Sequence, residues 1–313
     1  MDRDSRIYIA GHTGLFGSNT LRYLQEQGYR HFLLRTHREL DLTRQADVEK
    51  FFQKERPEYV FVMCGKVGGI AANASRMAEF AMENIQMSLN IIESAHKYSV
   101  KKLLYLGSSC MYPKNSLQPV KEEYLLQGEL EPTNEGYALA KLLGLKACAY
   151  YKRQYGDDFI SCIPANVYGP GDNFDEADSH VIPALLRRLY CARQEGTTDV
   201  VIWGSGKPKR DFLYIEDAVR ACVKLMQDYT EDETINIGTG ESISIRELAE
   251  TAAQVTGFEG ELVFDTTKPD GMMLRALENS KITRSMGWKP QVTLAEGLRR
   301  TYDWYLAKEA HGA

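Results

Sequence analysis

A glycine-rich turn close to the N-terminus, Gly11-His-Thr-Gly14-Leu-Phe-Gly17, constrains the fold more than any other feature of this sequence. It follows a short apolar run at residues 6–10 and opens a segment of helical periodicity at 18–27. Glycines let the backbone turn tightly and approach a pyrophosphate, and the next helix offers free N–H donors at its N-terminus. The spacing is G-x-x-G-x-x-G and not G-x-G-x-x-G, so a plain glycine-rich turn is the alternative. Its place after the first strand favours a dinucleotide loop, with cofactor contacts from Gly11, His12, Thr13, Gly14, Leu15, Phe16 and Gly17.

Short apolar runs alternate with helical segments through the first half of the chain. The pattern predicts strands at 6–10, 31–35, 59–63, 102–106 and 159–163, and helices at 18–27, 45–55, 84–98 and 136–155. Such alternation indicates an α/β fold, a Rossmann-type doubly wound parallel sheet. Dense polar turns begin near residue 166. We therefore expect a dinucleotide-binding domain at 1–165 and mainly a smaller C-terminal substrate-binding lobe at 166–313, with segments such as 234–237 returning to the main sheet.

Composition excludes several classes of protein. The net charge of −5 leaves no basic surplus for nucleic acid or an anionic membrane surface. The apolar runs are too short to span a membrane, and the charged first six residues are unlike a signal peptide. The six cysteines are dispersed and form no CxxC pair, which is typical of reduced thiols rather than disulfides or a zinc site. These features predict a cytoplasmic protein without a metal.

The end of the second predicted strand bears on cofactor choice. An NAD enzyme usually places an acid here to hold the ribose 2′-hydroxyl, whereas this chain has Arg35-Thr-His-Arg38. Basic residues favour a 2′-phosphate and hence NADP(H), with a solvated charged loop as the alternative. Asp41, just beyond, could place a carboxylate near the adenine.

A Tyr-x-x-x-Lys pair, Tyr137 and Lys141, lies within the predicted helix 136–155. The i, i+4 spacing puts both side chains on one helix face, where the lysine ammonium would favour the phenolate and lower the pKa of the tyrosine. Ser108 follows the predicted strand at 102–106, at the sheet edge where ligands bind, and its hydroxyl can polarise a carbonyl. An amphipathic helix face is the alternative for the pair alone. The glycine turn and Ser108 together make chance a poor explanation.

With these motifs in place, the whole chain resembles the extended short-chain dehydrogenase/reductases, and among them the GDP-L-fucose synthases. The resemblance is carried by Gly107-Ser-Ser-Cys-Met-Tyr-Pro113, Lys66-Val-Gly-Gly69, Glu131-Pro-Thr-Asn-Glu135, Asn166-Val-Tyr-Gly-Pro170, Asp172-Asn-Phe174, Ser179-His-Val-Ile-Pro183 and Trp203-Gly-Ser-Gly206. It implies a bifunctional enzyme that takes GDP-4-keto-6-deoxy-D-mannose, epimerises C3 and C5, and reduces C4 with NADPH. It also implies a homodimer formed through two helices of each subunit, for which 84–98 and 136–155 are the candidates.

Epimerisation beside a ketone needs a base on one face of the sugar and an acid on the other. Cys110 lies two residues after Ser108, so one turn can carry both toward the sugar, and His180 precedes a helix of the second lobe. A lone cysteine is usually a small core residue, and a lone histidine a hydrogen-bonding one. The resemblance overturns that interpretation, because these two positions serve as base and acid in the family.

The resemblance also assigns binding residues. Arg188, Trp203, Arg210 and Asp270 match positions that contact the GDP-sugar. Positions on the cofactor side are Leu106, Gly107, Pro164, Asn166, Val167 and His180, together with Tyr137 and Lys141. A solvated surface charge is the alternative for Arg188.

Two departures from the family pattern widen the choice of ligands. Thr13 stands where bacterial members often have a basic residue, which weakens the expected preference for NADPH. The tract 271–278 is less polar than usual and lies next to Asp270, so the substrate could be a related GDP-sugar of the colitose or keto-heptose kind. Two other functions are the alternatives. One is a nucleotide-sugar 4-epimerase or dehydratase, and the other is a non-catalytic regulator that binds a dinucleotide. A dehydratase would usually carry an acidic pair beside Ser108, and a regulator would be expected to lose Tyr137 or Lys141.

Overall fold

The computed structural model describes residues 1–175, 179–268 and 270–312 of the chain. Its centre is a six-stranded sheet in which all neighbouring strands run parallel. In sheet order the strands are β10 (Ile235–Ile237), β5 (Phe159–Pro164), β4 (Lys102–Leu106), β3 (Tyr59–Val62), β1 (Ile7–Ala10) and β2 (Phe32–Leu33). The parallel sheet confirms the predicted Rossmann-type α/β fold.

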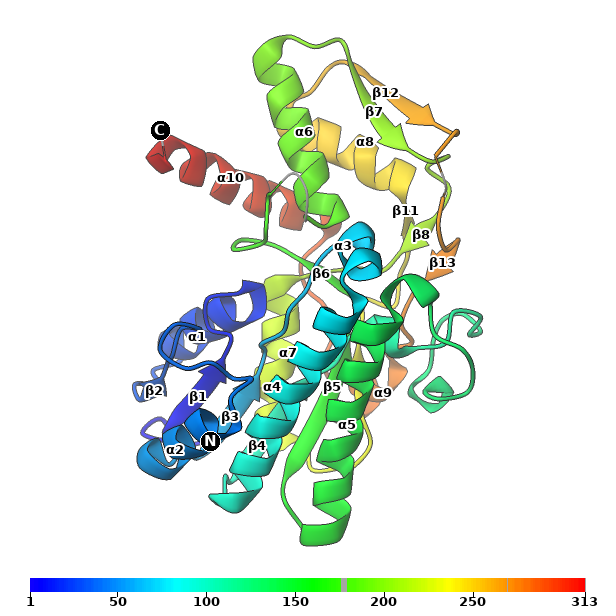
Figure 1. Ribbon diagram of the computed structural model, residues 1–313. Helices are drawn as coiled ribbons and strands as arrows, with labels where there is room; N and C mark the ends of the chain where they lie inside the picture. The colour runs from blue at the N-terminus through cyan, green and yellow to red at the C-terminus, as the bar shows by residue number, and fades with distance from the viewer. Residues whose placement is uncertain (176–178, 269, 313) are drawn as a thin grey trace.

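Helices cover both faces of this sheet (Figure 1). On one face α1 (Leu15–Glu26) packs against α7 (Ile215–Asp228), and on the other α4 (Met77–Lys97) packs between α2 (Gln45–Glu55) and α5 (Glu135–Tyr155). Shorter elements complete this part: α3 (Ile70–Ser75), α9 (Ser280–Met286), η1 (Ser109–Met111), η2 (Glu122–Tyr124) and η3 (Pro132–Asn134). The strands read as continuous apolar runs because a parallel sheet is buried on both faces.

The order of the strands places the ligand edge. β1 pairs with β2 on one side and with β3 on the other, so the winding of the sheet reverses at β1. Ligands of open α/β sheets bind outside the carboxyl ends of the strands at such a reversal. The glycine turn leaves β1 at this point.

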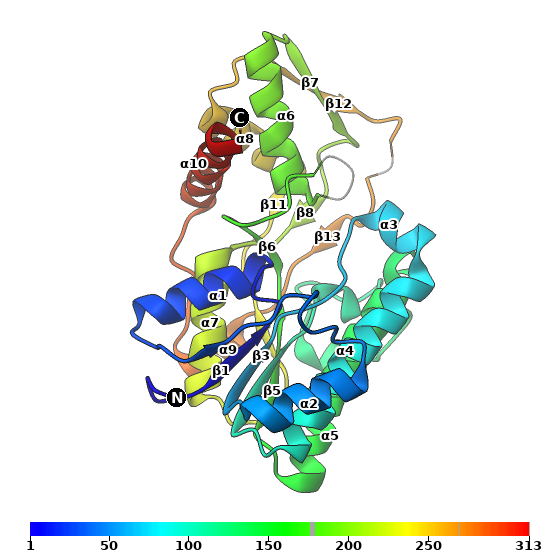
Figure 2. The same cartoon turned by 60° about the vertical axis from the view of Figure 1, so that its left-hand side comes forward.

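A smaller lobe stands above the carboxyl edge of the sheet (Figure 2). Its helices are α6 (Val181–Glu195), α8 (Ile245–Thr256) and α10 (Leu294–Gly312), and its strands are β7 (Asp199–Trp203), β12 (Glu261–Asp265), β8 (Lys209–Arg210), β11 (Ile243–Ser244) and β13 (Leu274–Arg275). The strand pair β6 (Asn166–Tyr168) and β9 (Phe212–Tyr214) lies at the junction between the lobes. From the second half of the chain, α7, α9 and β10 pack with the main sheet. No described helix is long and apolar enough to cross a membrane.

Two helices begin earlier than their apolar periodicity predicts. α4 begins at Met77 rather than at residue 84, because its first two turns bury Phe80 but expose Met77 and Met82, which interrupts the apolar spacing. Those turns are held by α5, where a Cβ at Gly136 would lie 2.8 Å from the Met77 carbonyl oxygen. α1 begins at Leu15 because Gly14, inside the turn, is already its N-cap.

Candidate active site

The glycine turn requires glycine at two of its three positions. Gly11 has φ +88°, and a Cβ there would lie 2.8 Å from backbone atoms of Cys64. A Cβ at Gly17 would lie 2.1 Å from the Gly11 carbonyl oxygen, so α1 could not pack so closely on the turn. Gly14 is different, because its Cβ would meet the Gly11 oxygen at an ordinary 3.5 Å. The first and third glycines thus build the turn, and the second leaves its outer face open.

The N-terminus of α1 is prepared for an anion. No side chain caps its first amides, and its first turn carries no acid. His12 contributes a buried Nδ1 that has no hydrogen-bond partner. Free amides, the positive end of the helix dipole and an orphaned ring nitrogen fit the pyrophosphate of a dinucleotide.

The side chains at the end of β2 are held by local contacts. Arg35 forms an ion pair with Glu55, with 2.8 Å between Nη2 and Oε1. Glu39 accepts hydrogen bonds from the backbone and hydroxyl of Thr36, which lower the pKa of this exposed carboxyl. Asp41 closes a turn by accepting from the backbone and hydroxyl of Thr43. Arg38 is exposed on the same loop.

Ser108 and Cys110 lie on the turn that leaves β4. Gly107 donates its N–H to the Cys162 carbonyl at 2.8 Å, which ties the start of the turn to β5. Ser108 then caps η1, and its Oγ accepts from the backbone of Cys110 at 3.5 Å. The Cys110 thiol donates to the same Oγ at 3.1 Å. The predicted pairing of these two side chains on one turn is therefore present.

Tyr137 reaches this turn from the first turns of α5, which packs against η1. Burial raises the pKa of Tyr137, the nearby Cys110 raises it further, and a hydrogen bond with Ser108 opposes them. The phenol is thus held in its protonated form. The three side chains form one cluster at the carboxyl edge of the sheet.

Lys141 lies one turn along α5 and is almost fully buried, with its Nζ 4.8 Å from the centre of the Tyr105 ring. Burial lowers the pKa of Lys141, and the thiols of Cys64, Cys110 and Cys162 oppose that change. The expected lowering of the tyrosine pKa is wrong for this structure, because burial dominates at Tyr137 and the lysine charge acts on the three thiols.

Burial and two positive charges, those of Lys141 and Arg275, act in opposite directions on the pKa of Cys110. Burial raises the pKa of Cys110 to about 11, whereas its hydrogen bond with Ser108 and the positive charges of Lys141 and Arg275 act to lower that pKa. A thiolate is the form that can take a proton from carbon. Burial therefore favours the protonated thiol, whereas the positive charges of Lys141 and Arg275 favour the thiolate.

His180 is the N-cap residue of α6, as its place before a predicted helix indicated. Its Nδ1 lies 3.9 Å from Oδ1 of Asp172, whose side chain is 5% exposed, whereas that of His180 is 55% exposed. The pKa of His180 is raised because the Asp172 carboxylate faces its ring, by hydrogen bonding and by charge. Residues 176–178, just before it, lie outside the described residues.

Three of the four residues expected to contact the nucleotide sugar gather in the upper lobe. Arg188 of α6 donates from Nη1 to the Val201 carbonyl of β7 at 3.0 Å, beside the exposed Trp203. Asp270 accepts from the backbone and hydroxyl of Ser205, at 2.6 Å and 2.8 Å, and so closes the turn after Trp203. Its carboxylate is thus engaged within the protein rather than free.

Arg210, the fourth, lies on β8 near the junction of the lobes. Its partial burial lowers the pKa of its guanidinium. Asn166 and Val167 lie on β6, just after Pro164 ends β5. Asn166 donates from its backbone and its side-chain amide to the carbonyl of Asp211, the residue after Arg210. The strand that carries the expected cofactor positions is therefore hydrogen-bonded to the residue that follows Arg210.

Sequence reasoning gave no role to two charged residues beside the site. Asp172 is buried with an Oδ2 that lacks a partner, and Arg275 is buried with an Nη1 that lacks one. Asp172 belongs to a quoted motif, but the motif alone does not show that it faces His180. Arg275 lies on a two-residue strand, which has no periodic signal to indicate burial.

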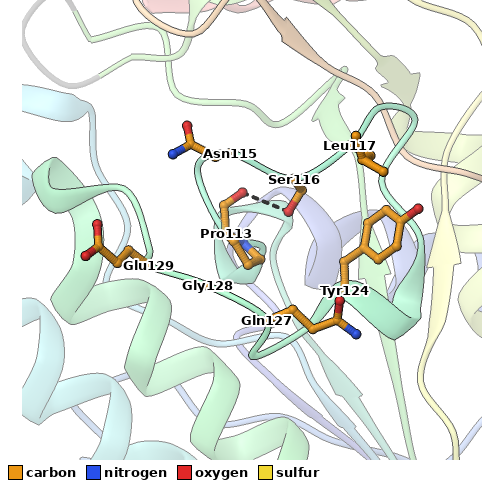
Figure 3. Close-up of a pocket in the computed structure, with 8 residues that line it drawn as sticks. All are labelled: Pro113, Asn115, Ser116, Leu117, Tyr124, Gln127, Gly128 and Glu129. Atoms are coloured by element: carbon orange, nitrogen blue, oxygen red, sulfur yellow. Dashed lines mark hydrogen bonds between the residues drawn. The ribbon is translucent and has the colours of Figure 1, made fainter.

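A cavity of about 320 Å³ opens in the loop between residues 113 and 129 (Figure 3). Its lining includes Pro113, Leu117 and Tyr124, and Ser116, also in the lining, donates to the Pro113 carbonyl at 2.9 Å. None of the predicted site residues lines it. The cavity is therefore a separate feature of this loop.

The chain is similar in sequence and in structure to known proteins of one family. Residues 7–238 match the NAD dependent epimerase/dehydratase family. The chain is 52% identical over 305 residues to GDP-L-fucose synthase 1 of Arabidopsis thaliana, covering 97% of this chain and 94% of that protein. A GDP-6-OMe-4-keto-L-xylo-heptose reductase from C. jejuni has a TM-score of 0.93 at 38% identity, with 98% and 99% of the chains covered. A GDP-L-fucose synthetase from Naegleria fowleri bound to NADP has a TM-score of 0.91 at 30% identity, with 99% and 96% covered.

These matches span nearly the whole length of both partners in each pair, so they include the glycine turn, the β4 turn, α5 and the upper lobe together. The resemblance inferred from the motifs is thereby confirmed, and the chain belongs to the NAD dependent epimerase/dehydratase family.

Proposed function

We propose that this chain is a bifunctional epimerase-reductase that converts GDP-4-keto-6-deoxy-D-mannose into GDP-L-fucose with NADPH. The observation that carries the proposal is the cluster of Ser108, Cys110 and Tyr137 at the carboxyl edge of the sheet, with Lys141 beneath it. The relative from Arabidopsis thaliana is a GDP-L-fucose synthase, and the solved synthetase from Naegleria fowleri binds NADP.

The epimerisation rests on acidity beside the ketone. The 4-ketone acidifies the C–H bonds at C3 and C5, because loss of either proton gives an enolate. In our proposal the Cys110 thiolate removes the proton, and His180 returns one from the opposite face. Ser108 and Tyr137 donate hydrogen bonds to the enolate oxygen and stabilise the charge that forms there.

The reduction uses the same oxygen. When bound, NADPH would supply the hydride for C4, and the residues of the cluster would hold the ketone and provide the proton. Tyr137 donates its proton to the ketone oxygen, a role for which a phenol held protonated by burial is suited. Lys141 holds positive charge beneath the cluster and compensates the charge left on the tyrosine. Ser108 keeps the ketone oriented toward Tyr137.

Binding follows from charge and shape. The free amides of α1 and the orphaned His12 nitrogen would hold the pyrophosphate of NADP(H), and Arg35 and Arg38 its 2′-phosphate. For the GDP-sugar, Arg188 and Arg210 offer guanidinium forks to the diphosphate, and the exposed face of Trp203 packs on the ligand. Asp270 would act through the turn it closes, since Ser205 already occupies both of its oxygens.

A related GDP-keto-sugar, of the colitose or keto-heptose kind, is the second candidate substrate. The tract after Asp270 favours it, because this tract is less polar than usual in the family, with Leu274 at an often basic position, and its Met273 is 53% exposed. The similarity of the whole chain to a GDP-keto-heptose reductase points the same way.

We also propose a homodimer built on the outer face of α4 and α5. Large apolar side chains are exposed there, namely Met82, Leu139, Leu143 and Tyr150. Exposed apolar patches of this kind mark interaction surfaces. A division at residues 1–165 and 166–313 between cofactor and substrate lobes accompanies this proposal. The cytoplasm is the proposed location, since the cysteines are free thiols.

The deciding experiment is incubation with GDP-4-keto-6-deoxy-D-mannose and NADPH, with the product identified by NMR. Formation of GDP-L-fucose is the expected result. Parallel reactions with GDP-4-keto-3,6-dideoxy-mannose and with a GDP-keto-heptose test the second candidate. Faster turnover of either of these would move the assignment to that sugar, and no oxidation of NADPH with any of them would reject an epimerase-reductase.

A further inference from the structure

Tyr105 is a fully buried tyrosine of β4 that lies close to the site in sequence, before Ser108. Its side chain lies on the face of the sheet that α4 and α5 cover side by side (Figure 1). The Tyr105 hydroxyl shares a hydrogen bond of 3.0 Å with the hydroxyl of Ser88 on α4. A buried phenol usually has such a partner, so this bond anchors one end of the side chain. The flat faces of the ring remain for packing.

The helix α5 approaches the ring of Tyr105 through a glycine. Gly144 follows Lys141 at i+3 spacing, so both lie on the same face of the helix. A Cβ at Gly144 would collide with the ring and the hydroxyl of Tyr105. Glycine within a helix is unfavourable relative to alanine, and here it lets the helix lie directly against the ring. This close approach fixes the ring beside Lys141.

The ammonium of Lys141 lies over the ring of Tyr105. Its Nζ is 4.8 Å from the ring centre, and the negative face of an aromatic ring attracts a cation within about 6 Å. Lys141 is almost fully buried, so little water screens this attraction. Tyr137, one turn earlier on the same helix, is held protonated by burial, which raises its pKa, and adds no charge.

The other titratable groups that face Lys141 are three thiols, those of Cys64, Cys110 and Cys162, and no carboxylate of the described residues is among them. Burial raises the pKa of Cys64 and of Cys110 to about 11. A hydrogen bond with Cys222 and burial raise the pKa of Cys162 as well. Near neutral pH the three thiols are therefore protonated and uncharged. The aromatic ring is thus the side chain that stabilises the ammonium against burial, which lowers the pKa of Lys141.

We propose that Tyr105 is a positioning residue for Lys141: the face of its ring holds the ammonium beneath the cluster at the sheet edge and offsets part of the cost of burying that charge. The inference rests on the proposed function and deepens it, since Lys141 compensates the charge left on Tyr137 after reduction. Tyr105 acts through Lys141, and we assign it no contact with the sugar or the cofactor.

The first test measures the Lys141 ammonium directly and needs neither substrate nor cofactor. The free enzyme is labelled with lysine enriched in ¹³C at Cε, and the signal of Lys141, assigned with Lys141→Arg, is titrated by NMR. Tyr105→Leu removes the ring and should lower the midpoint by about one pH unit, because the cation–π contact is lost. Tyr105→Phe keeps the ring face and should titrate close to the wild type, although it leaves the Ser88 hydroxyl without its partner.

Phe61→Leu is the matched control for the loss of a buried ring. Phe61 is fully buried on β3, and it pairs in register with Leu104, so its side chain lies on the opposite face of the sheet from Tyr105. This variant should lower the melting temperature and leave the Lys141 midpoint unmoved. Tyr105→Met, with a longer and more adaptable side chain, replaces the leucine variant if that variant does not fold. An unmoved or raised midpoint without the ring, or an equal fall in Phe61→Leu, would overturn the proposal.

The second test follows oxidation of NADPH with GDP-4-keto-6-deoxy-D-mannose across a pH series. In Tyr105→Leu the fall of kcat on the basic side should begin about one pH unit lower than in the wild type, because Lys141 loses its proton earlier. A merely structural defect would lower kcat by the same factor at every pH, and that outcome would contradict the proposal. If the wild type oxidises no NADPH with any GDP-keto-sugar while the Lys141 midpoint still depends on the ring, the proposed function fails and the contact between Tyr105 and Lys141 stands.

Discussion

Asp172 and His180 face each other across 3.9 Å, from Oδ1 to Nδ1, with the carboxyl buried and the imidazole half exposed. The pairing stabilises the imidazolium, and a partner on Nδ1 leaves Nε2 as the nitrogen that can deliver a proton. This arrangement is expected of a histidine that stays protonated, and can therefore donate a proton, at a pH above the ordinary pKa of histidine.

Asp172→Asn tests that relationship. Asparagine keeps an oxygen for the backbone N–H of Asn173 but loses the charge, so the pKa of His180 should fall toward its ordinary value. The charged pair contributes stability that is fully present below about pH 6.5, the ordinary pKa of histidine, and is lost as the pH rises through the raised pKa. The variant should therefore lose stability mainly on the acid side. As the pH rises, its epimerisation should begin to fall at a lower pH than that of the wild type, because the imidazolium of His180 loses its proton earlier. NMR titration, with His180→Gln to assign the signal, measures the shift, and an unmoved titration would contradict the pairing.

Tyr137→Phe should abolish reduction of the keto-sugar. The phenol is the proposed proton donor to the ketone oxygen, and loss of such a group costs on the order of 10²- to 10⁴-fold in rate. Oxidation of NADPH at 340 nm measures the effect. A rate near that of the wild type would assign the proton to another group.

Cys110→Ser should separate the two reactions. A serine hydroxyl has the right size but is far too weakly acidic to form a comparable base, while Tyr137 and the cofactor site are unchanged. Wild type in D₂O should label C3 and C5, and the variant should label neither, yet slowly reduce the ketone to the unepimerised GDP-rhamnose. Labelling of both carbons at the wild-type rate would make Cys110 a packed thiol.

NADPH should be preferred over NADH, because Arg35 and Arg38 stand at the end of β2. Charge-assisted hydrogen bonds to a phosphate support a preference of about tenfold or more in kcat/KM. Thr13 supplies no charge, so NADH should still react. Glu55→Gln should strengthen the preference, since it frees Arg35 from its ion pair. A higher kcat/KM for NADH would show that these arginines do not read the 2′-phosphate.

Two matched glycine variants test the turn. Gly17→Ala should lower the free energy of unfolding by about 3 kcal/mol, because its Cβ would lie 2.1 Å from the Gly11 oxygen. Gly14→Ala has room within the protein and should fold normally, but its methyl group would face the pyrophosphate and weaken NADPH binding. Thermal unfolding and NADPH titration measure the two effects. Equal stability of both variants would contradict the account of the turn.

The sequence by itself determined the fold class and the chemistry of the main cluster. Both depend on local patterns: apolar runs of strand length separated by helical segments, glycines at positions that admit no Cβ, and Tyr137 four residues before Lys141 on one helix face. α2 and β4 have the predicted bounds for the same reason, because their apolar spacing is set by burial against the sheet.

The tertiary structure decided what surrounds each of these side chains. The pKa of Tyr137 is raised and not lowered because the phenol is buried, and burial is a property of the packed molecule. Asp172 meets His180 because a loop and the N-terminus of α6 come together, and Arg275 is buried on the two-residue strand β13 that pairs with β8. Loops and a strand of two residues leave no periodic signal in the sequence, since only the packing of the chain around them buries Asp172 and Arg275.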